Sequence, residues 1–339
     1  MQRHINIACF MLLIATPCVA VTDEHVPTPL RYVSADQATP LAQVIDTRAL
    51  ANCQKRTIAG AHCLPASDLV GPDGQLPSFV DIFWALGTAG ISPHRPVLIV
   101  GNQSRARDFV AGLLYLCGQS SVQILKTPVE LVLHQKHWPA AQGQTRGILR
   151  HTVYDANMRD KLIVLPTELI HLLATDNSLI TIDGRNESAQ NADEYRTGHI
   201  PGAIRLVSTQ ARPISRYLPR PATDKHGTRL PLTAPAGPAR FVTYANNAVD
   251  SIAYFTRVRA SEPNPQVDIR VLPAGWQGWI KYQNFPMTPS GSSPQRQAGH
   301  TYLPPINNSI YPVAAILVSA TAMLIIFMSL RKRGEKQWS

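Results

Sequence analysis

The feature that most constrains the fold of this chain is an internal repeat. A strand-like run closed by Asp and Arg is followed by a glycine-containing segment, a second apolar run, a helix-like stretch and another strand. The order recurs at a separation of about 140 residues, which is the length of one domain. Strands that alternate with helices predict parallel sheets flanked by helices, so we expect two duplicated α/β domains. The paired segments are residues 44–48 and 180–185, 57–61 and 197–204, 97–100 and 241–244, 106–116 and 252–258, and 122–125 and 267–272.

The second half carries motifs of a known family. Residues 183–185 (DGR), 194–204 (EYRTGHIPGAI) and 274–279 (AGWQGW) resemble the opening and closing blocks of the rhodanese (sulfurtransferase) family. The first half resembles it by order and spacing, although Ala59 replaces the expected proline and Thr127-Pro128 replaces the usual glycine pair. The resemblance implies two rhodanese-like domains, each a small parallel sheet flanked by helices, at residues 30–140 and 160–288, with a linker at 141–159.

The nucleophile of the resembled family is missing from both halves. In that family the central strand ends at a cysteine, whose thiolate sits among backbone N–H groups before a helix and carries the sulfur. Here the strand-like runs lead to Gly101 and to Ala245. We therefore expect a catalytically inactive protein that acts as a binding or scaffold module. The alternative is a sulfurtransferase with a non-standard thiol, for which Cys117 or Cys63 would have to reach a loop.

The vacant loops still carry polar residues. Residues 101–106 place Asn102, Ser104 and Arg105 ahead of a helix, a pattern that either binds a small anion or forms a solvated loop. The second loop has no cation, and Asp250 would repel an anion unless it serves only as a helix N-cap. No histidine lies close in sequence to activate a serine. Asp183 and Arg185 alternate at a strand end, where we expect a structural ion pair.

The cysteines point to an oxidising compartment or to buried thiols. Cys53 and Cys63 stand ten residues apart and either close a disulfide or remain two buried thiols, with Cys117 left over on an apolar helix. His62 alone makes no metal site, and we expect neither a metal nor another cofactor.

Both ends of the chain carry membrane-targeting signals. Residues 1–20 have the pattern of a cleaved secretory signal, which would remove Cys9 and Cys18. Residues 289–309 form a Pro/Ser-rich spacer, residues 310–330 a transmembrane helix, and residues 331–339 a basic cytoplasmic tail. We expect a single-pass membrane protein with extracytoplasmic domains, typical of a bacterial periplasm. Asn-x-Ser sequons at Asn102, Asn186 and Asn307 leave a eukaryotic cell surface as the alternative.

A proline-dense basic segment interrupts the second half at residues 212–239. It either docks an acidic protein partner near the vacant site or is a tolerated insertion. The net charge of the whole chain is +10, but no dense basic stripe with interleaved aromatic residues occurs, so we expect no binding of nucleic acid.

Overall fold

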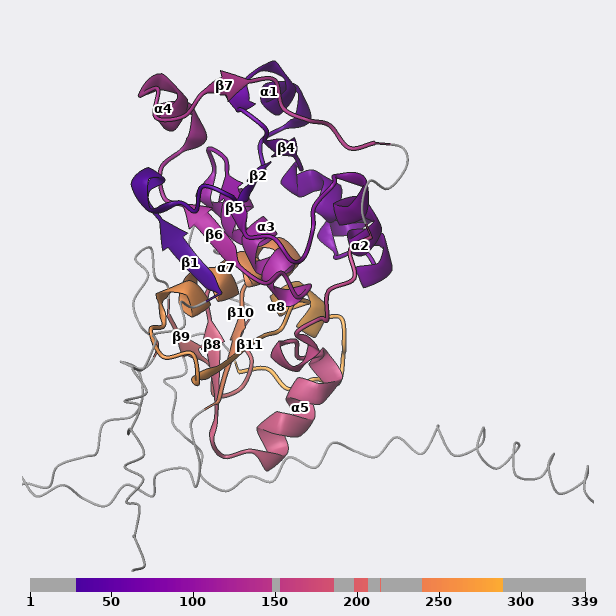
Figure 1. Ribbon diagram of the computed structural model, residues 1–339. Coiled ribbons are helices and arrows are strands. Elements are labelled where there is room, and N and C mark those ends of the chain that lie inside the picture. The colour runs from indigo at the N-terminus through magenta and orange to yellow at the C-terminus, as the bar shows by residue number, and fades with distance from the viewer. Residues whose placement is uncertain (1–28, 148–152, 186–197, 207–213, 215–239, 289–339) are drawn as a thin grey trace, which may run out of the picture.

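A computed structural model describes residues 29–147, 153–185, 198–206, 214 and 240–288. The described part of the chain contains two parallel sheets, one in each half of the sequence (Figure 1). The predicted signal peptide, most of the proline-dense segment, the spacer and the predicted transmembrane helix lie outside the described residues. Among the helices that are described, none has both the length and the apolar character that a membrane span requires.

The first sheet has five parallel strands among the described residues, in the order β1-β6-β5-β2-β4. Helices cover both of its faces, so the central strands are buried on both sides and read as continuous apolar runs. All four residues of β5, for example, are buried. The strands are β1 (Leu30–Val33), β2 (Gln43–Asp46), β4 (His62–Cys63), β5 (Val97–Val100) and β6 (Val122–Leu125). A separate antiparallel pair joins β3 (Thr57–Ile58) to β7 (Ala140–Ala141).

The second sheet repeats the strand order of the first. Its described strands run β11-β10-β8-β9, all parallel, and an isolated parallel bridge from Ile163 to Val271 stands where β1 stands in the first sheet. Asp183 is paired with Tyr244 in this sheet, as Asp46 is paired with Val100 in the first. The strands are β8 (Leu179–Asp183), β9 (Ile204–Arg205), β10 (Arg240–Tyr244) and β11 (Asp268–Val271). The prediction of an α/β fold with parallel sheets is therefore confirmed.

The helices follow the same repeated order. In each half, the central strand is followed at once by a long buried helix, α3 after β5 and α7 after β10. The α-helices are α1 (Leu50–Lys55), α2 (Phe79–Thr88), α3 (Ser104–Leu116), α4 (Val129–His134), α5 (Pro166–Thr175), α7 (Ala248–Ser261) and α8 (Gly275–Trp279). Short 3-10 turns are η1 (Ala35–Gln37), η2 (Ala66–Leu69), η3 (Pro72–Gly74) and η4 (Asp160–Leu162).

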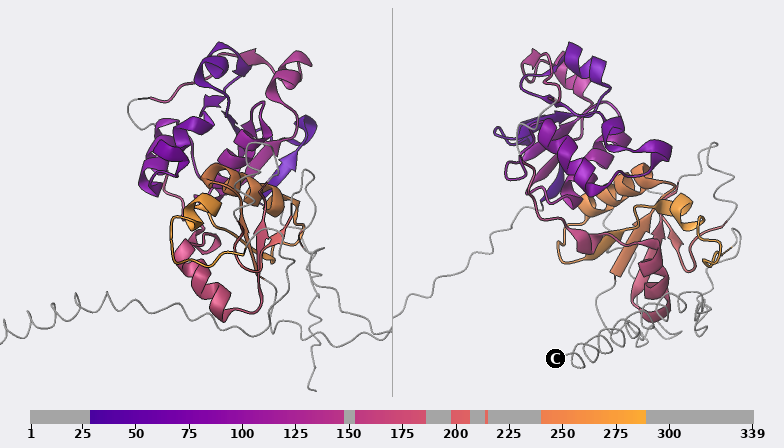
Figure 2. Two further views of the ribbon diagram at one scale, coloured as in Figure 1. Left: turned by 180° about the vertical axis from the view of Figure 1, so that it is seen from behind. Right: turned by 90° about the vertical axis from the view of Figure 1, so that its right-hand side faces the viewer.

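Helices α3 and α7 pack against each other and join the two halves (Figures 1 and 2). They meet at Gly112, where an added Cβ would overlap with the hydroxyl of Thr256. Gly112 lies eleven residues after Gly101, and Thr256 lies eleven residues after Ala245, so equivalent positions of the repeat meet. Buried apolar residues from both halves form one continuous cluster across this contact. The two sheets therefore share a core.

The first half extends further along the chain than the predicted boundary at residue 140. Strand β7 pairs with β3, and Gln144 makes a parallel bridge to His62 at the edge of the first sheet. Part of the predicted linker at 141–159 is thus built into the first half. This backbone pairing involves small and polar residues, which show no apolar period in the sequence.

Candidate functional site

Both vacant positions lie at the carboxyl ends of the central strands. Gly101 directly follows β5, and Ala245 directly follows β10, each just before the long helix of its half. The carboxyl edge of a parallel sheet is where α/β proteins bind ligands, and a helix N-terminus there favours anions. The candidate site thus has the expected location in both halves.

The loop at Gly101 has no space for a side chain. An added Cβ would overlap with Oγ1 of Thr47, a buried residue whose hydroxyl donates to the carbonyl of Val100 over 3.1 Å. The carbonyl of Gly101 accepts from Nη1 of Arg107 at 2.6 Å and from the backbone N–H of Val129 at 3.2 Å. The loop is therefore closed around the position that would carry a nucleophile.

Arg107 holds this loop, and sequence reasoning missed it. Its side chain is buried, and its guanidinium also donates to the carbonyl of Lys126 over 3.3 Å. Burial lowers the pKa of Arg107 below its usual value. The signal that could have identified it is the charged pair Arg107-Asp108 directly before the apolar run at residues 109–116.

The three candidate anion-binding residues lie at the start of α3, and two of them have partners within the protein. Asn102 Oδ1 accepts from the backbone N–H of Glu130 at 3.3 Å. Arg105 Nε donates to Asp250 Oδ1 over 2.5 Å, which ties the first turn of α3 to the first turn of α7. Ser104 is exposed. Anion binding here stays a prediction, and it would require Arg105 to share or leave its carboxylate partner.

The loop at Ala245 is packed against the start of α8. Ala245 is buried, its N–H donates to Oγ of Ser251 over 2.9 Å, and its carbonyl accepts from the N–H of Trp276 at 2.8 Å. Gly275 allows this approach, because an added Cβ would lie 2.8 Å from two carbonyl oxygens of the loop and from Oγ of Ser251 on α7. Asn247, and not Asp250, caps α7, since its side chain accepts from the N–H of Asp250.

A buried ion pair, Asp183 with Arg185, lies next to the second loop and holds its neighbours in place. Arg185 forms a bidentate pair with Asp183, donates to the carbonyl of Gly198 over 2.8 Å, and stacks 4.5 Å from the ring centre of Trp276. Tyr244 donates its hydroxyl to the same carboxylate over 2.8 Å. Burial and the charge of Asp183 raise the pKa of Tyr244 well above its usual value. These groups are engaged with one another, as expected for a structural pair.

The first half contains the same arrangement. Arg48 pairs with Asp46 and donates to the carbonyl of Arg56 over 2.7 Å, while the hydroxyl of Thr57 donates to Asp46 over 2.7 Å. In both halves an Asp-x-Arg unit at a strand end ties the sheet to the following loop. The repeat therefore extends to side-chain contacts.

None of the described cysteines offers a reactive thiol. Cys53 and Cys63 form a disulfide with their Cα atoms 5.8 Å apart, which is the first of the two predicted alternatives. Cys117 is fully buried at the end of α3, and burial raises the pKa of its thiol to about 12. It is therefore a protonated, inaccessible thiol at neutral pH. Among the described residues, no group of three or more His, Cys, Asp or Glu side chains is placed to hold a metal.

A protein-family comparison finds a similarity in the second half. The family model described as rhodanese-like domain matches residues 165–282. Residues 165–282 are therefore similar to a rhodanese-like domain. A comparison with curated protein sequences gives no match.

Solved structures show the same fold over a longer stretch. YnjE matches with a TM-score of 0.54 and 16% sequence identity over 74% of this chain. EanB, solved with ergothioneine, matches with a TM-score of 0.54 and 15% sequence identity, also over 74% of this chain. The chain spans 63% of YnjE and 66% of EanB, less than two thirds of either. The Tum1 protein of Saccharomyces cerevisiae matches with a TM-score of 0.53 and 15% identity, over 75% of this chain and 95% of that one. At these identities the likeness concerns the fold.

Proposed function

We propose that this chain is a membrane-anchored, extracytoplasmic tandem rhodanese-like protein that works by binding and not by sulfur transfer. The tandem arrangement is supported by the repeated strand order, the repeated Asp-x-Arg unit and the meeting of Gly112 with Thr256. The extracytoplasmic location is supported by the disulfide, because such bonds persist in oxidising compartments. The anchor is proposed from the sequence of residues 310–330.

The observation that carries the proposal is the environment of the two vacant positions. Sulfur transfer requires a thiolate that can attack a donor and then carry the sulfur. Ala245 has no thiol, and Gly101 has neither a thiol nor the space for one, since Thr47 fills it. Adding the missing atom at Gly101 would demand a rearrangement of the loop.

The alternative, a sulfurtransferase that uses a non-standard thiol, finds no support in the arrangement of the cysteines. Cys63 is bonded to Cys53. Cys117 is buried, and the raised pKa of its thiol leaves almost no thiolate at neutral pH. Such an enzyme would need a large local opening to expose a nucleophile.

A thiosulfate:cyanide assay on the purified protein tests the proposal. We expect the wild type to form no thiocyanate above the uncatalysed background. Ala245→Cys serves as the comparison, because it restores the thiol in the half that has kept the family motifs. Thiocyanate formation by the wild type that disappears when thiols are blocked would overturn the proposal.

The binding role is proposed to involve a protein partner near the membrane. The proline-dense segment at 212–239 is rich in Arg and Lys, which suits an acidic partner. Cross-linking in intact membranes should capture a partner with the wild type and lose it when residues 215–239 are replaced by a Gly/Ser linker. Capture that is equal in both proteins would contradict a docking role for this segment.

A further inference from the structure

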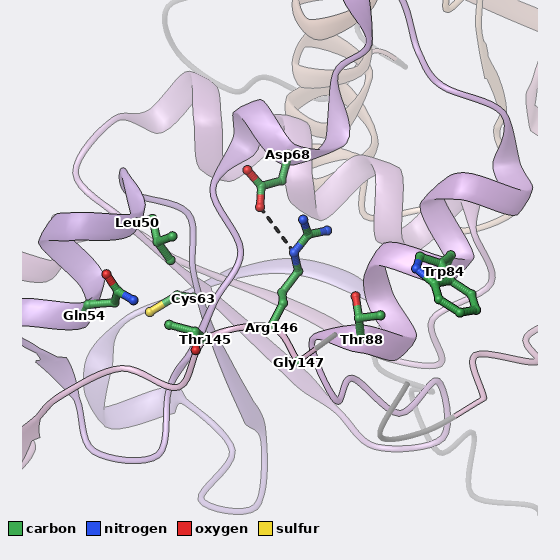
Figure 3. A pocket seen from close by; sticks show the side chains of 9 residues that line it. All are labelled: Leu50, Gln54, Cys63, Asp68, Trp84, Thr88, Thr145, Arg146 and Gly147. Carbon is green, nitrogen blue, oxygen red and sulfur yellow. Dashed lines mark ion pairs between the residues drawn. The ribbon is translucent and has the colours of Figure 1, made fainter. Parts of the chain in front are cut away.

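The first half contains a cavity that belongs to neither vacant loop. Its volume is about 330 Å³, within the range of pockets that hold small molecules. It lies between α1, η2, α2 and the segment that follows β7 (Figure 3). Gly101 and Ala245 are not among its lining residues, which are Leu50, Gln54, Cys63, Asp68, Trp84, Thr88, Thr145, Arg146 and Gly147.

One wall of the cavity is fixed rigidly in place. Residues 143–147, which we call the strap, cross the disulfide so closely that a Cβ at Gly143 would overlap with both sulfur atoms. The strap is then held by four backbone hydrogen bonds. These run from Gly143 N to Cys53 O at 3.2 Å, from Gln144 N to Ala61 O at 2.8 Å, from Cys63 N to Gln144 O at 2.7 Å, and from Gly147 N to Thr88 O at 3.0 Å. Thr145 and Arg146 are therefore positioned before any ligand arrives.

The cavity presents one positive and one negative group side by side. Arg146 Nε lies 3.4 Å from Asp68 Oδ2, and the two side chains are 36% and 29% exposed. Figure 3 shows the guanidinium and the carboxylate facing each other among the lining residues. Because Asp68 meets Nε, the two terminal nitrogens of Arg146 remain available to a ligand. A pair this open to water contributes little to stability, so both groups can exchange their contact for a charged ligand at little cost.

The remaining walls include large apolar side chains that are open to solvent. Trp84 on α2 is 49% exposed and Leu50 on α1 is 43% exposed. Val80 does not line the cavity, but it lies one turn before Trp84 on the same helix and is 77% exposed. Aromatic side chains at the edge of a cavity are typical of small-molecule sites, where they cover the apolar part of a ligand.

We propose that this cavity binds a free α-amino acid with a large apolar side chain. The carboxylate of the ligand pairs with Arg146, its ammonium pairs with Asp68, and its side chain packs on Trp84, which lies on one side of this pair (Figure 3). An anion without an ammonium would face the like charge of Asp68, and a cation without a carboxylate would face Arg146. A zwitterion satisfies both groups at once, and this match decides the ligand class.

Calorimetric titration of the full-length chain in mild detergent tests the proposal with L-phenylalanine as the probe. We expect saturable binding at one site per chain. Two analogues separate the charges, since 3-phenylpropanoate lacks the ammonium and phenethylamine lacks the carboxylate. Each analogue should bind at least about tenfold more weakly than L-phenylalanine, because each leaves one charged group of the cavity without a partner.

Matched variants locate the site. Arg146→Gln and Asp68→Asn should each weaken the binding of L-phenylalanine by about tenfold or more. Arg95→Gln is the control, because Arg95 is an exposed arginine of the same half that does not line the cavity. Circular dichroism checks that each variant is folded, and where one is not, the analogue series on the wild type still decides.

Three results would overturn the proposal. The first is the absence of saturable binding up to about 10 mM L-phenylalanine, because a specific site of this kind should bind more tightly than that. The second is binding of 3-phenylpropanoate that is as tight as binding of L-phenylalanine. The third is an unchanged affinity for L-phenylalanine in Arg146→Gln. The outcome is independent of the sulfur-transfer assay, because the cavity uses none of the residues of the vacant loops.

Discussion

At the scale of single residues, the two missing nucleophiles have different surroundings. Gly101 is enclosed by Thr47 and by the guanidinium of Arg107, whereas Ala245 already has a side chain whose Cβ the loop accommodates. From the sequence alone the two positions without a cysteine look equivalent, because the sequence shows which residue stands at each position but not which residues surround it in space. The difference arises from contacts between segments more than fifty residues apart, such as Thr47 with Val100.

A cysteine at the first vacant position should destabilise the protein. Gly101→Cys introduces a Cβ into the space of the Thr47 hydroxyl, and we expect the free energy of unfolding to fall by about 1–3 kcal/mol. Urea denaturation measures this change. Thr47→Ala in the same chain should recover part of it, and Ala245→Cys should cost less. An equal loss in Gly101→Cys with and without Thr47→Ala would contradict steric enclosure by this residue.

Asp108 should make the stability depend on pH. It is buried on α3, accepts from the hydroxyl of Tyr32 at 2.9 Å, and lies near Arg107 on its own helix and 3.8 Å from Arg257 of α7. Burial raises the pKa of Asp108 from 3.8 to about 6, although Tyr32 and the two arginines oppose this shift. The folded state therefore holds the proton more tightly than the unfolded state. The stabilisation from this proton is present below about pH 4 and is lost as the pH rises through about 6.

Asp108→Asn should remove this pH dependence, because the amide does not titrate and its oxygen can still accept from Tyr32. Between pH 4 and pH 7 we expect the free energy of unfolding of the wild type to fall relative to that of the variant by up to about 3 kcal/mol. Urea titrations at a series of pH values measure the difference. Asp160→Asn, an exposed carboxylate, is the control. Parallel pH profiles for the wild type and Asp108→Asn would show that the pKa of Asp108 is close to normal.

At the scale of elements, the sequence predicts the strands better than the helix boundaries. Buried strands appear as continuous apolar runs, and residues 97–100 and 122–125 coincide with β5 and β6. Helix α7 is predicted from residue 252 but begins at Ala248, because its first turn is held by the Asn247 cap and shows no apolar period. The contact between α3 and α7 is not predictable from apolar patterns. These patterns indicate which face of a helix is buried, but they do not indicate which element packs against it.

Gly112 determines how closely these two helices approach. In an isolated helix, replacing glycine with a larger residue would favour the helix by up to about 1 kcal/mol. Here the added Cβ would overlap with Thr256, whose hydroxyl donates to the carbonyl of Ile252 over 2.8 Å. We expect Gly112→Val to lower the free energy of unfolding by about 1–3 kcal/mol, measured by urea denaturation. Thr256→Gly should relieve the overlap, and a Gly112→Val variant as stable as the wild type would contradict the close contact.

At the scale of the whole molecule, the shared core makes the two halves interdependent. The apolar cluster runs from the first sheet through α3 and α7 into the second sheet, and Arg105 with Asp250 and Arg257 with Asp108 cross the same contact in opposite directions. Domains that touch only through small polar interfaces move and unfold separately. A continuous buried core should instead couple their unfolding.

We therefore expect a single calorimetric transition for the folded part of the molecule, with a calorimetric enthalpy equal to the van't Hoff enthalpy. Gly112→Val should lower the midpoint for both halves together, because the substitution lies in the contact that joins them. In a variant whose Trp84, Trp138 and Trp338 are replaced by Phe, tryptophan fluorescence reports only Trp276 and Trp279 of the second half, while thiol exposure of Cys117 reports the first half. Coincident midpoints for the two signals indicate coupled halves. Two separate transitions in the wild type would mean that the α3–α7 contact contributes too little energy to hold the tandem together.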